Sequence, residues 1–346
     1  MLKQLSLSEF DYNLPEELIA QTPADKRENS RMLVLDKGRI SHKHFYDIVD
    51  LLDKDTLLVL NNTKVIPARL FAQKETGARI EVFLIKEMPQ HGGQSGVRHM
   101  WEALIKPSKR VKLGMILTVS PELQVKVFEQ LEDRWVVELI YEGNIYDVLQ
   151  RNGHIPLPPY IAREACAQDL ERYQTVYAQK EGSVAAPTAG LHFTNEILDK
   201  LKAKGIEIAY VTLNVGLGTF RPVKCENILE HKMDSETFEI SEEAAQAINS
   251  AKKVVAVGTT TVRTLETAFQ KYGRIQACQD SSELFIYPPY EFKVVDGLIT
   301  NFHLPKSTLL MLVSALAGRE NIFKAYEEAV KNKYRFYSYG DCMFIT

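Results

Sequence analysis

Five short segments of alternating apolar and polar residues follow one another between residues 79 and 141, and they constrain the fold more than any other feature of the sequence. Strands of a sheet that faces a core on one side alternate in this way, and several in succession are typical of a small antiparallel barrel or sandwich. The segments are 79–85, 101–105, 115–120, 123–128 and 134–141. The chain must therefore contain an all-β unit.

The rest of the chain predicts a different architecture, because helix-like and strand-like segments alternate along it. Amphipathic helices are expected over 195–205, 242–253 and 262–273, and apolar strands such as 206–215 and 254–258 lie between them. This alternation favours a largely parallel sheet that is covered by helices on both faces. Further strands are expected at 31–36, 56–60, 283–288, 298–304 and 334–340.

The all-β run interrupts this alternation, and the length of 346 residues exceeds what one core usually organises. We therefore predict an α/β domain that is formed by both chain ends, residues 1–62 and 154–346, with an inserted β domain at residues 63–153. A helix over 145–153 and the proline-rich segment 154–160 mark the return to the first domain.

Net charge limits how the protein can contact nucleic acid. The chain has 42 basic and 45 acidic residues, a net charge of −3, so any contact with RNA must use local patches. The best patch contains Lys106, Lys109, Arg110 and Lys112. A second basic segment, 331–339, also carries aromatic residues, but we interpret it as a final strand whose rings pack in the core.

Several classes of protein are not indicated. The four cysteines are far apart, without a C-x-x-C pair, and His42 and His44 have no third ligand at metal spacing, so we predict no metal. The N-terminus lacks the apolar stretch of a secretory signal, and the apolar run at 308–318 is too short to span a bilayer. We expect a cytoplasmic protein that makes no contact with membranes.

Segments between a strand and a helix are candidates for a binding site, because ligands of open α/β sheets bind beyond the carboxyl ends of the strands. In residues 255–266, Gly258 permits close approach of the backbone, and Thr259 and Thr260 lie at a predicted helix N-terminus. Free N–H groups there favour a carboxylate or a phosphate. A threonine cap after a tight turn explains the same residues equally well.

Two other strand ends carry glycine. Gly216 and Gly218 follow a predicted strand, although the third glycine of a dinucleotide fingerprint is missing and no helix follows directly. Gly190 lies in a segment of small residues, 184–194, before another predicted helix. Ordinary turns explain these glycines unless other evidence is added.

His192 and His303 are candidates for a proton acceptor. His192 lies in the segment of small residues, and His303 directly precedes a proline turn and a helix. An imidazole has an ordinary pKa of about 6.5, which suits a base near neutral pH. A structural role is the alternative for each of them.

Eight segments, taken together and in order, resemble the signature blocks of the S-adenosylmethionine:tRNA ribosyltransferase-isomerases of queuosine biosynthesis. They are LNNTKVIPARLF (60–71), HIPLPPYI (154–161), YQTVYA (173–178), VAAPTAGLHF (184–193), VGLGTFRPV (215–223), VGTTTVRTLE (257–266), TNFHLPKSTLLMLVSA (300–315) and YRFYSYGDCMFI (334–345). The resemblance runs nearly end to end, and eight blocks in the right order leave little room for coincidence.

The resemblance implies a fold and an activity. The fold is a six-stranded antiparallel β-barrel inserted in an α/β/α sandwich, which agrees with the pattern of the sequence. Members of the family transfer and rearrange the ribosyl group of S-adenosylmethionine onto the 7-aminomethyl-7-deazaguanine base at the tRNA wobble position, and they release adenine and methionine and leave epoxyqueuosine in the tRNA. S-adenosylmethionine is then a co-substrate, without a tightly bound cofactor, and tRNA with the precursor base is the partner. We expect a monomer.

This chemistry assigns roles to the candidates. The sulfonium makes the C5′ hydrogens of the donor acidic, so a base is required. We predict His192 and His303 as catalytic residues. The predicted substrate-binding residues are Arg69, Gly190, Gly216, Gly218, Gly258, Thr259 and Thr260, and the predicted RNA-binding residues are Lys106, Lys109, Arg110 and Lys112.

The chain departs from the family pattern at two positions. Asn214 and Asp234 stand where the family often has histidine, so neither position provides an indispensable imidazole. Two rival functions are an S-adenosylmethionine-dependent RNA methyltransferase and a non-catalytic RNA-binding module. A methyltransferase needs a glycine-rich turn that opens a helix, and the sequence does not offer one cleanly. An RNA-binding module leaves the glycines and threonines at the strand ends unexplained.

Overall fold

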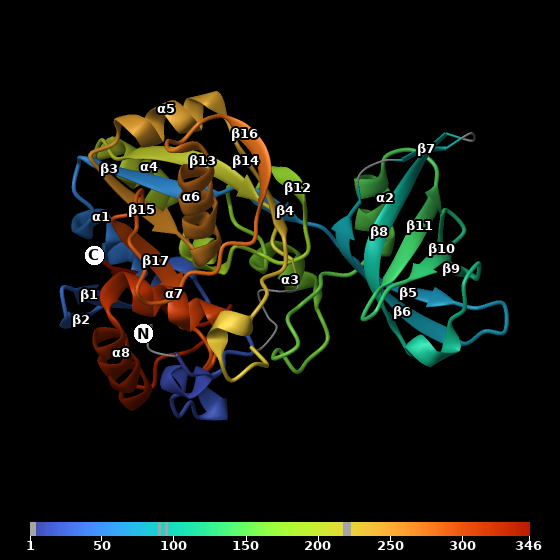
Figure 1. Ribbon diagram of the computed structural model, residues 1–346, viewed down its shortest axis with the longest axis horizontal. Helices are drawn as coiled ribbons and strands as arrows, with labels where there is room; N and C mark the ends of the chain where they lie inside the picture. Colours follow the sequence, from blue (N-terminus) through green and yellow to red (C-terminus); the bar gives the residue numbers. More distant parts are fainter. Residues whose placement is uncertain (1–4, 89–90, 94–95, 217–222) are drawn as a thin grey trace.

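A nine-stranded sheet forms the centre of the larger part of the molecule, which we call the α/β body (Figure 1). The computed structural model describes residues 5–88, 91–93, 96–216 and 223–346. In spatial order the strands are β16 (Cys278–Ser282), β14 (Glu236–Ile240), β13 (Glu207–Leu213), β3 (Thr56–Asn61), β15 (Lys253–Val257), β17 (Gly297–Asn301), β18 (Cys342–Ile345), β1 (Arg31–Asp36) and β2 (Arg39–His44). Strands from both chain ends thus share one sheet.

The sheet is mixed, and the prediction of a largely parallel sheet was wrong. Strands β13, β3, β15 and β17 run parallel to one another, and β1 runs parallel to β18. The pairs β1–β2, β13–β14, β14–β16 and β17–β18 are antiparallel. The tight turn at Lys37 and Gly38, both with positive φ, joins β1 directly to β2, and such a short connection permits only antiparallel pairing.

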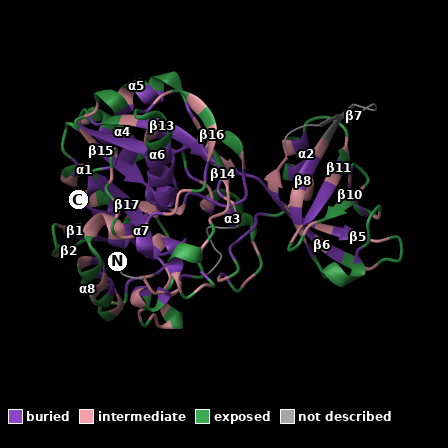
Figure 2. Ribbon diagram, viewed as in Figure 1, coloured by how far each residue is buried: buried purple, intermediate pink, exposed green. Residues whose placement is uncertain are grey.

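Helices cover both faces of the sheet. The α-helices of the chain are α1 (Ile48–Leu51), α2 (Ile145–Asn152), α3 (Ala167–Arg172), α4 (Asn195–Ala203), α5 (Glu242–Ser250), α6 (Thr259–Tyr272), α7 (Thr308–Ala317) and α8 (Arg319–Lys331). Successive side chains of a strand point to opposite faces, so Leu57 and Val59 of β3 pack with α5 to α8, while Leu58 and Leu60 pack with α1 and α4. The body is therefore an α/β/α sandwich with two apolar layers (Figure 2).

Six antiparallel strands form a closed barrel beside this body (Figure 1). In order they are β11 (Trp135–Tyr141), β10 (Leu123–Gln130), β9 (Ile116–Ser120), β5 (Arg69–Gln73), β6 (Arg79–Glu87) and β8 (Gly96–Lys106), and β7 (His91–Gly93) pairs with β8 outside the ring. The barrel closes where Trp135 of β11 pairs with Ala103 of β8. Irregular registers in β6 and β10 bend these strands, as closure requires. The predicted sandwich with an inserted antiparallel barrel is thus confirmed.

The two parts meet through a short parallel pair, β4 (Thr63–Val65) with β12 (Lys180–Ser183). The chain enters the barrel after β4 and leaves it through α2, whose first turn is capped by the Asn144 side chain. The boundaries that we predicted at residues 62 and 154 stay a prediction. No helix among the described residues is long and apolar enough to cross a membrane.

Two predicted strands were wrong. Residues 283–288 form no strand, because side chains there form hydrogen bonds with backbone groups that a strand would pair. For example, Arg263 Nε donates to the Leu284 carbonyl. Residues 334–340 form a turn, in which Tyr337 has a φ of +74° and Asp341 N donates to Arg335 O. The last strand is β18, directly after this turn. The rings of Tyr334 and Phe336 are buried, which confirms that these aromatics pack in the core.

Candidate functional site

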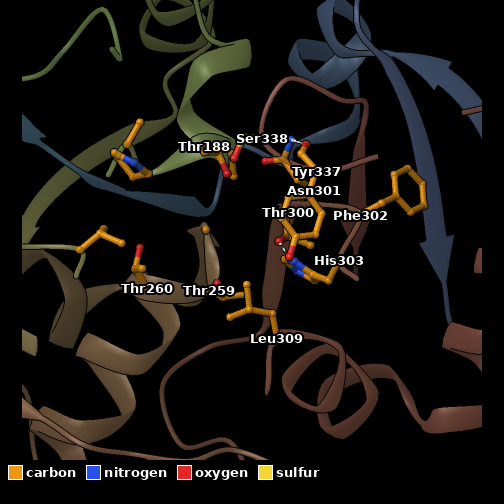
Figure 3. A pocket seen from close by; sticks show the side chains of 15 residues that line it. Thr188, Thr259, Thr260, Thr300, Asn301, Phe302, His303, Leu309, Tyr337 and Ser338 are labelled. Atoms are coloured by element: carbon orange, nitrogen blue, oxygen red, sulfur yellow. Dashed lines mark hydrogen bonds between the residues drawn. The ribbon is translucent and has the colours of Figure 1, made fainter. Parts of the chain in front are cut away.

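A cavity lies at the carboxyl ends of β15 and β17, and none of the described residues on its wall has a charged side chain, so we call it the neutral cavity (Figure 3). Its described wall consists of residues 186–189, 258–260, 300–303 and 337–338, together with Val215 and Leu309. Ligands of α/β sheets bind at this edge, because loops after parallel strands converge there. The predicted residues Gly258, Thr259, Thr260 and His303 all line this cavity.

The neutral cavity combines apolar side chains with hydroxyl and amide groups. Gly258 has a φ of +89° and is the N-cap of α6, without a side-chain cap, so the first N–H groups of this helix are available to a ligand. His303 Nε2 lies 3.0 Å from Thr300 Oγ1. Burial lowers the pKa of His303 to about 3, so the imidazole is neutral at physiological pH.

His192 is not part of the cavity wall but lies behind Asn301, which is. Asn301 Nδ2 is 3.2 Å from His192 Nε2, and His192 Nδ1 is 2.8 Å from Ser30 Oγ. Burial, together with the charges of Arg27 and Arg335, lowers the pKa of His192 to about 3. Both ring nitrogens are thus occupied by protein groups, and the predicted role of this residue as a proton acceptor stays untested.

A second cavity, which we call the acidic cleft, lies between the barrel and the α/β body. The barrel and α2 provide Ile85, Lys86, Glu87, Glu102, Arg134 and Tyr146, and the body provides Glu181, Gly182, Asn214, Val215, Gly216 and residues 234–237. Five carboxylates therefore face two basic side chains among the described residues. The cleft adjoins the neutral cavity, because Val215 lines both.

One buried ion pair organises the wall of the acidic cleft. Glu236 Oε2 accepts a hydrogen bond of 2.7 Å from Arg263 Nη1, and Glu236 Oε1 accepts one of 3.0 Å from Gly216 N. The two side chains are only 3% and 4% exposed. Arg263 belongs to α6, whose first turn lines the neutral cavity, so the pair links the two cavities. Gly216, a predicted substrate-binding residue, is therefore held at the cleft.

The remaining predicted substrate-binding residues lie elsewhere. Gly190 N donates to Pro187 O, and a Cβ at Gly190 would come within 2.0 Å of Tyr177 Oη, so this glycine allows close packing below the cavity. Arg69 lies on β5 of the barrel and forms an ion pair of 3.0 Å with Glu81. The structure therefore does not bring Arg69 or Gly190 into either cavity. Gly218 lies outside the described residues.

The predicted RNA-binding residues form an exposed group on the barrel. Lys106 ends β8, and Lys109 and Arg110 belong to a short 3₁₀ helix, Ser108–Arg110, that leads to Lys112. All four residues are exposed. This basic segment lines neither cavity.

The sequence did not single out several residues of the two cavities. Asn301, Tyr337 and Ser338 lie in segments that we predicted as strands, and only the packing of the turn at 334–340 against β17 brings them together. The carboxylates of the cleft come from distant parts of the chain, so no motif predicts them. Asn214 and Asp234, the two departures from the family pattern, both line this cleft.

Among the described residues, no group of three or more histidine, cysteine, aspartate or glutamate side chains is arranged to hold a metal ion. The carboxylates of the acidic cleft therefore do not form a ready-made cation site. Their neighbours are the basic and polar groups of the protein itself: Lys64 Nζ lies 3.0 Å from Glu181, and Arg134 Nη1 lies 2.7 Å from Glu102.

The sequence matches a family model described as "Queuosine biosynthesis protein" over residues 7–345. It is 53% identical over 350 residues to an S-adenosylmethionine:tRNA ribosyltransferase-isomerase of Acetivibrio thermocellus, with 99% of this chain and 100% of that protein covered. A protein of the same description from a Sulfurihydrogenibium species is 51% identical over 349 residues, with 99% and 100% covered.

A solved structure is also similar. It is the crystal structure, at 2.00 Å resolution, of S-adenosylmethionine tRNA ribosyltransferase from Thermotoga maritima. The two chains are 37% identical and align with a TM-score of 0.54, over 98% of this chain and 100% of the other. The similarity therefore extends over both the barrel and the α/β body.

Proposed function

Because the chain belongs to the family of queuosine biosynthesis proteins, we propose that it builds epoxyqueuosine in tRNA from the ribosyl group of S-adenosylmethionine. It is an S-adenosylmethionine:tRNA ribosyltransferase-isomerase, and hence a transferase. The acceptor in this proposal is the 7-aminomethyl-7-deazaguanine base at the wobble position. The other products are adenine and methionine.

The observation that carries the proposal is the similarity of more than 50% identity over the whole length of two proteins with that name. The arrangement of the site supports it. A donor with a neutral adenine and a cationic sulfonium suits two adjoining cavities, of which one has no charged side chain on its described wall and the other has more carboxylates than basic side chains among its described residues. The barrel contributes one wall of the cleft, so tRNA on the barrel surface would lie beside the donor.

For the proton acceptor we propose His303. Its imidazole lines the neutral cavity, and burial lowers its pKa to about 3, so it is unprotonated at neutral pH but is a weaker base than the free imidazole assumed from the sequence. His192 has both ring nitrogens engaged and does not reach the wall. The base removes a C5′ hydrogen of the donor, which the adjacent sulfonium makes acidic, and the neutral amine of the acceptor base then bonds to the sugar. Gly258, Thr259 and Thr260 bind the donor in this proposal.

The basic segment with Lys109 and Arg110 is proposed to contact the phosphates of tRNA. Its side chains are exposed on the barrel and line neither cavity. The predictions that the enzyme works in the cytoplasm, as a monomer and without a tightly bound cofactor stay predictions.

One incubation tests the proposed function. The purified protein is mixed with S-adenosylmethionine and with tRNA that carries the precursor base, and the digested tRNA is analysed by mass spectrometry. We expect epoxyqueuosine in the tRNA and one free adenine per modified nucleoside. Release of S-adenosylhomocysteine instead would identify a methyltransferase, and tRNA binding without turnover of the donor would identify a binding module.

A further inference from the structure

Two buried polar atoms on the wall of the neutral cavity have no hydrogen-bond partner among the described residues. They are Thr260 Oγ1, on the first turn of α6, and Asn301 Oδ1, at the end of β17. Their side chains are 6% and 4% exposed, and Figure 3 shows them on opposite sides of the cavity. An unpaired buried polar atom is costly, so such a pair in one cavity indicates a ligand that completes both bonds.

The orientation of the Asn301 amide is fixed by its neighbours. Asn301 Nδ2 lies 3.1 Å from Tyr337 O and 3.4 Å from Asp341 O, and carbonyl oxygens accept hydrogen bonds but never donate them. The nitrogen of the amide must therefore face these two carbonyls. Asn301 Oδ1 is left as an acceptor, so the ligand must offer an N–H or O–H group at this point.

A chain of hydrogen bonds behind Asn301 supports the same assignment. The Ser30 hydroxyl donates to Arg27 O at 2.8 Å, so its oxygen accepts from the Nδ1–H of His192. The lone pair of His192 Nε2 then faces Asn301 Nδ2, whose two N–H groups are shared among this nitrogen and the carbonyls of Tyr337 and Asp341. His192 in this arrangement is a positioning residue, which acts through Asn301.

We propose that the neutral cavity binds the adenine of the donor, and that Asn301 Oδ1 accepts a hydrogen bond from its 6-amino group. This inference rests on the proposed function. Among the described residues, the cavity wall has no carboxylate to pair with an ammonium, and the ammonium and carboxylate of the methionine moiety share one carbon and must enter together, so this end of the donor does not suit the cavity. Adenine is the neutral part of the donor that carries an N–H donor, and the Thr260 hydroxyl bonds to a nitrogen of its ring.

The position of α6 also suits adenine as a leaving group. Adenine departs with the electron pair of the bond between its N9 and the ribose carbon, and it takes up one proton, which balances the proton that the base removes from C5′ of the donor. The uncapped first N–H groups of α6, which follow Gly258, stabilise the negative charge that develops in this step. The sulfonium and the amino acid end then extend past Val215 towards the carboxylates of the acidic cleft.

The first test replaces two threonines that both have a buried hydroxyl without a hydrogen-bond partner among the described residues of the free protein. Thr56 Oγ1 is also buried and without a partner among the described residues, but it lies at the amino end of β3, away from the cavity. Thr260→Val and Thr56→Val should both keep or raise the melting temperature, since each removes an unpaired hydroxyl. Only Thr260→Val should weaken binding of S-adenosylmethionine, by about 10-fold, as measured by calorimetry. Equal affinities in the two variants would overturn the proposal.

The second test addresses the 6-amino group. Calorimetry compares S-adenosylmethionine with its inosine counterpart, in which a carbonyl replaces that group. The wild type should prefer the amino compound by about 10-fold or more, because the carbonyl would face another acceptor, and Asn301→Ala, checked for folding by circular dichroism, should bind both alike. If the wild type makes no epoxyqueuosine, the proposed function fails. If it makes the product but Asn301→Ala keeps the preference for the amino compound, this inference alone fails.

Discussion

The neutral cavity and the acidic cleft lie side by side at one edge of the sheet, yet they differ in the side chains and in the parts of the molecule that form their walls. The described wall of the cavity comes entirely from the α/β body, from the end of β17, the starts of α6 and α7 and the loops beside them, with hydroxyl and amide groups on an apolar wall. The cleft needs side chains from the barrel as well, and it collects charges of both signs with an excess of carboxylates. If the donor binds as we propose, one fold thereby separates the neutral and the cationic parts of a single donor.

The two cavities also differ in whether the protein itself supplies hydrogen-bond partners for their buried polar atoms. In the cleft, the buried Glu236 carboxylate is satisfied by the protein itself, through Arg263 and Gly216 N. In the cavity, Thr260 Oγ1 and Asn301 Oδ1 are left for a ligand, within the described part of the chain. Substitutions in the cleft should therefore affect mainly stability, and those in the cavity mainly donor binding and turnover.

The largest expected effect concerns His303. His303→Ala should lower turnover by about 10²–10⁴-fold, the usual range for the loss of a general base, and it should abolish exchange of the C5′ hydrogens of the donor with deuterated solvent. His44→Ala, on an exposed strand, is the control and should keep both. Wild-type exchange in His303→Ala would identify another base.

The pH dependence sharpens this prediction. The pKa of His303 is lowered from 6.5 to about 3, so the imidazole is already neutral throughout the range from pH 5 to 8. The value of kcat/KM for the donor, which reports groups of the free enzyme, should then not rise through pH 6.5. A rise centred there would contradict a buried, neutral His303.

The next largest effect concerns the buried ion pair beside the cleft. Arg263→Met leaves the Glu236 carboxylate buried without this partner and should lower the free energy of unfolding by about 3–5 kcal/mol. Lys64→Met removes the partner of Glu181 in a pair that is 41% and 35% exposed, and it should cost no more than about 1 kcal/mol. Urea unfolding measures both, and equal losses would show that burial of the first pair is unimportant.

Two glycines, one on each cavity, give a smaller effect. Gly258 has a φ of +89°, so Gly258→Ala should cost about 1–3 kcal/mol in strain. Its Cβ would lie 3.6 Å from Thr260 Oγ1, which narrows the cavity, so donor affinity should fall while tRNA binding survives. Among the described residues, a Cβ at Gly216 would meet only Glu236 Oε1, at 3.9 Å, so Gly216→Ala should change stability by about 0.5 kcal/mol or less. Similar losses of stability and of donor affinity in the two variants would contradict the prediction that the glycine of the neutral cavity is the more sensitive one.

The smallest effect concerns tRNA, whose phosphates the acidic cleft should repel. Replacing Lys109 and Arg110 by alanine should reduce the slope of log affinity against log salt concentration by about one for each lost phosphate contact. Replacing Lys200 and Lys202, which are exposed on α4 of the α/β body, is the charge-matched control and should leave the slope unchanged. An unchanged slope in the barrel variant would place the RNA surface elsewhere.

Sequence patterns predicted the fold and part of the neutral cavity. Alternation of apolar residues identified the barrel strands, and the alternation of helices and strands identified the sandwich, because both patterns follow from which side chains face a core. Gly258, Thr260 and His303 were predicted because they follow strands whose carboxyl ends share an edge. The turn at 334–340 was missed, since its aromatic residues suit a strand as well as they suit a packed turn.

The acidic cleft could not be predicted from the sequence. Its carboxylates lie on β6, β8, β12 and β14 and, in the case of Asp234, just before β14, and only the docking of the barrel against the α/β body brings them together. Asn301 was likewise overlooked, because its significance depends on which of its amide atoms the buried carbonyls of Tyr337 and Asp341 leave free. These contacts depend on the tertiary structure, so no local pattern in the sequence predicts them.

Photo-cross-linking tests the division of the donor between the two cavities most directly. A donor with an azide on its adenine ring is bound to the protein and irradiated, and the labelled peptides are identified by mass spectrometry. The account predicts label in residues 186–189, 258–260 or 300–303 of the neutral cavity. Label in residues 85–87 or 234–237 of the acidic cleft would contradict it.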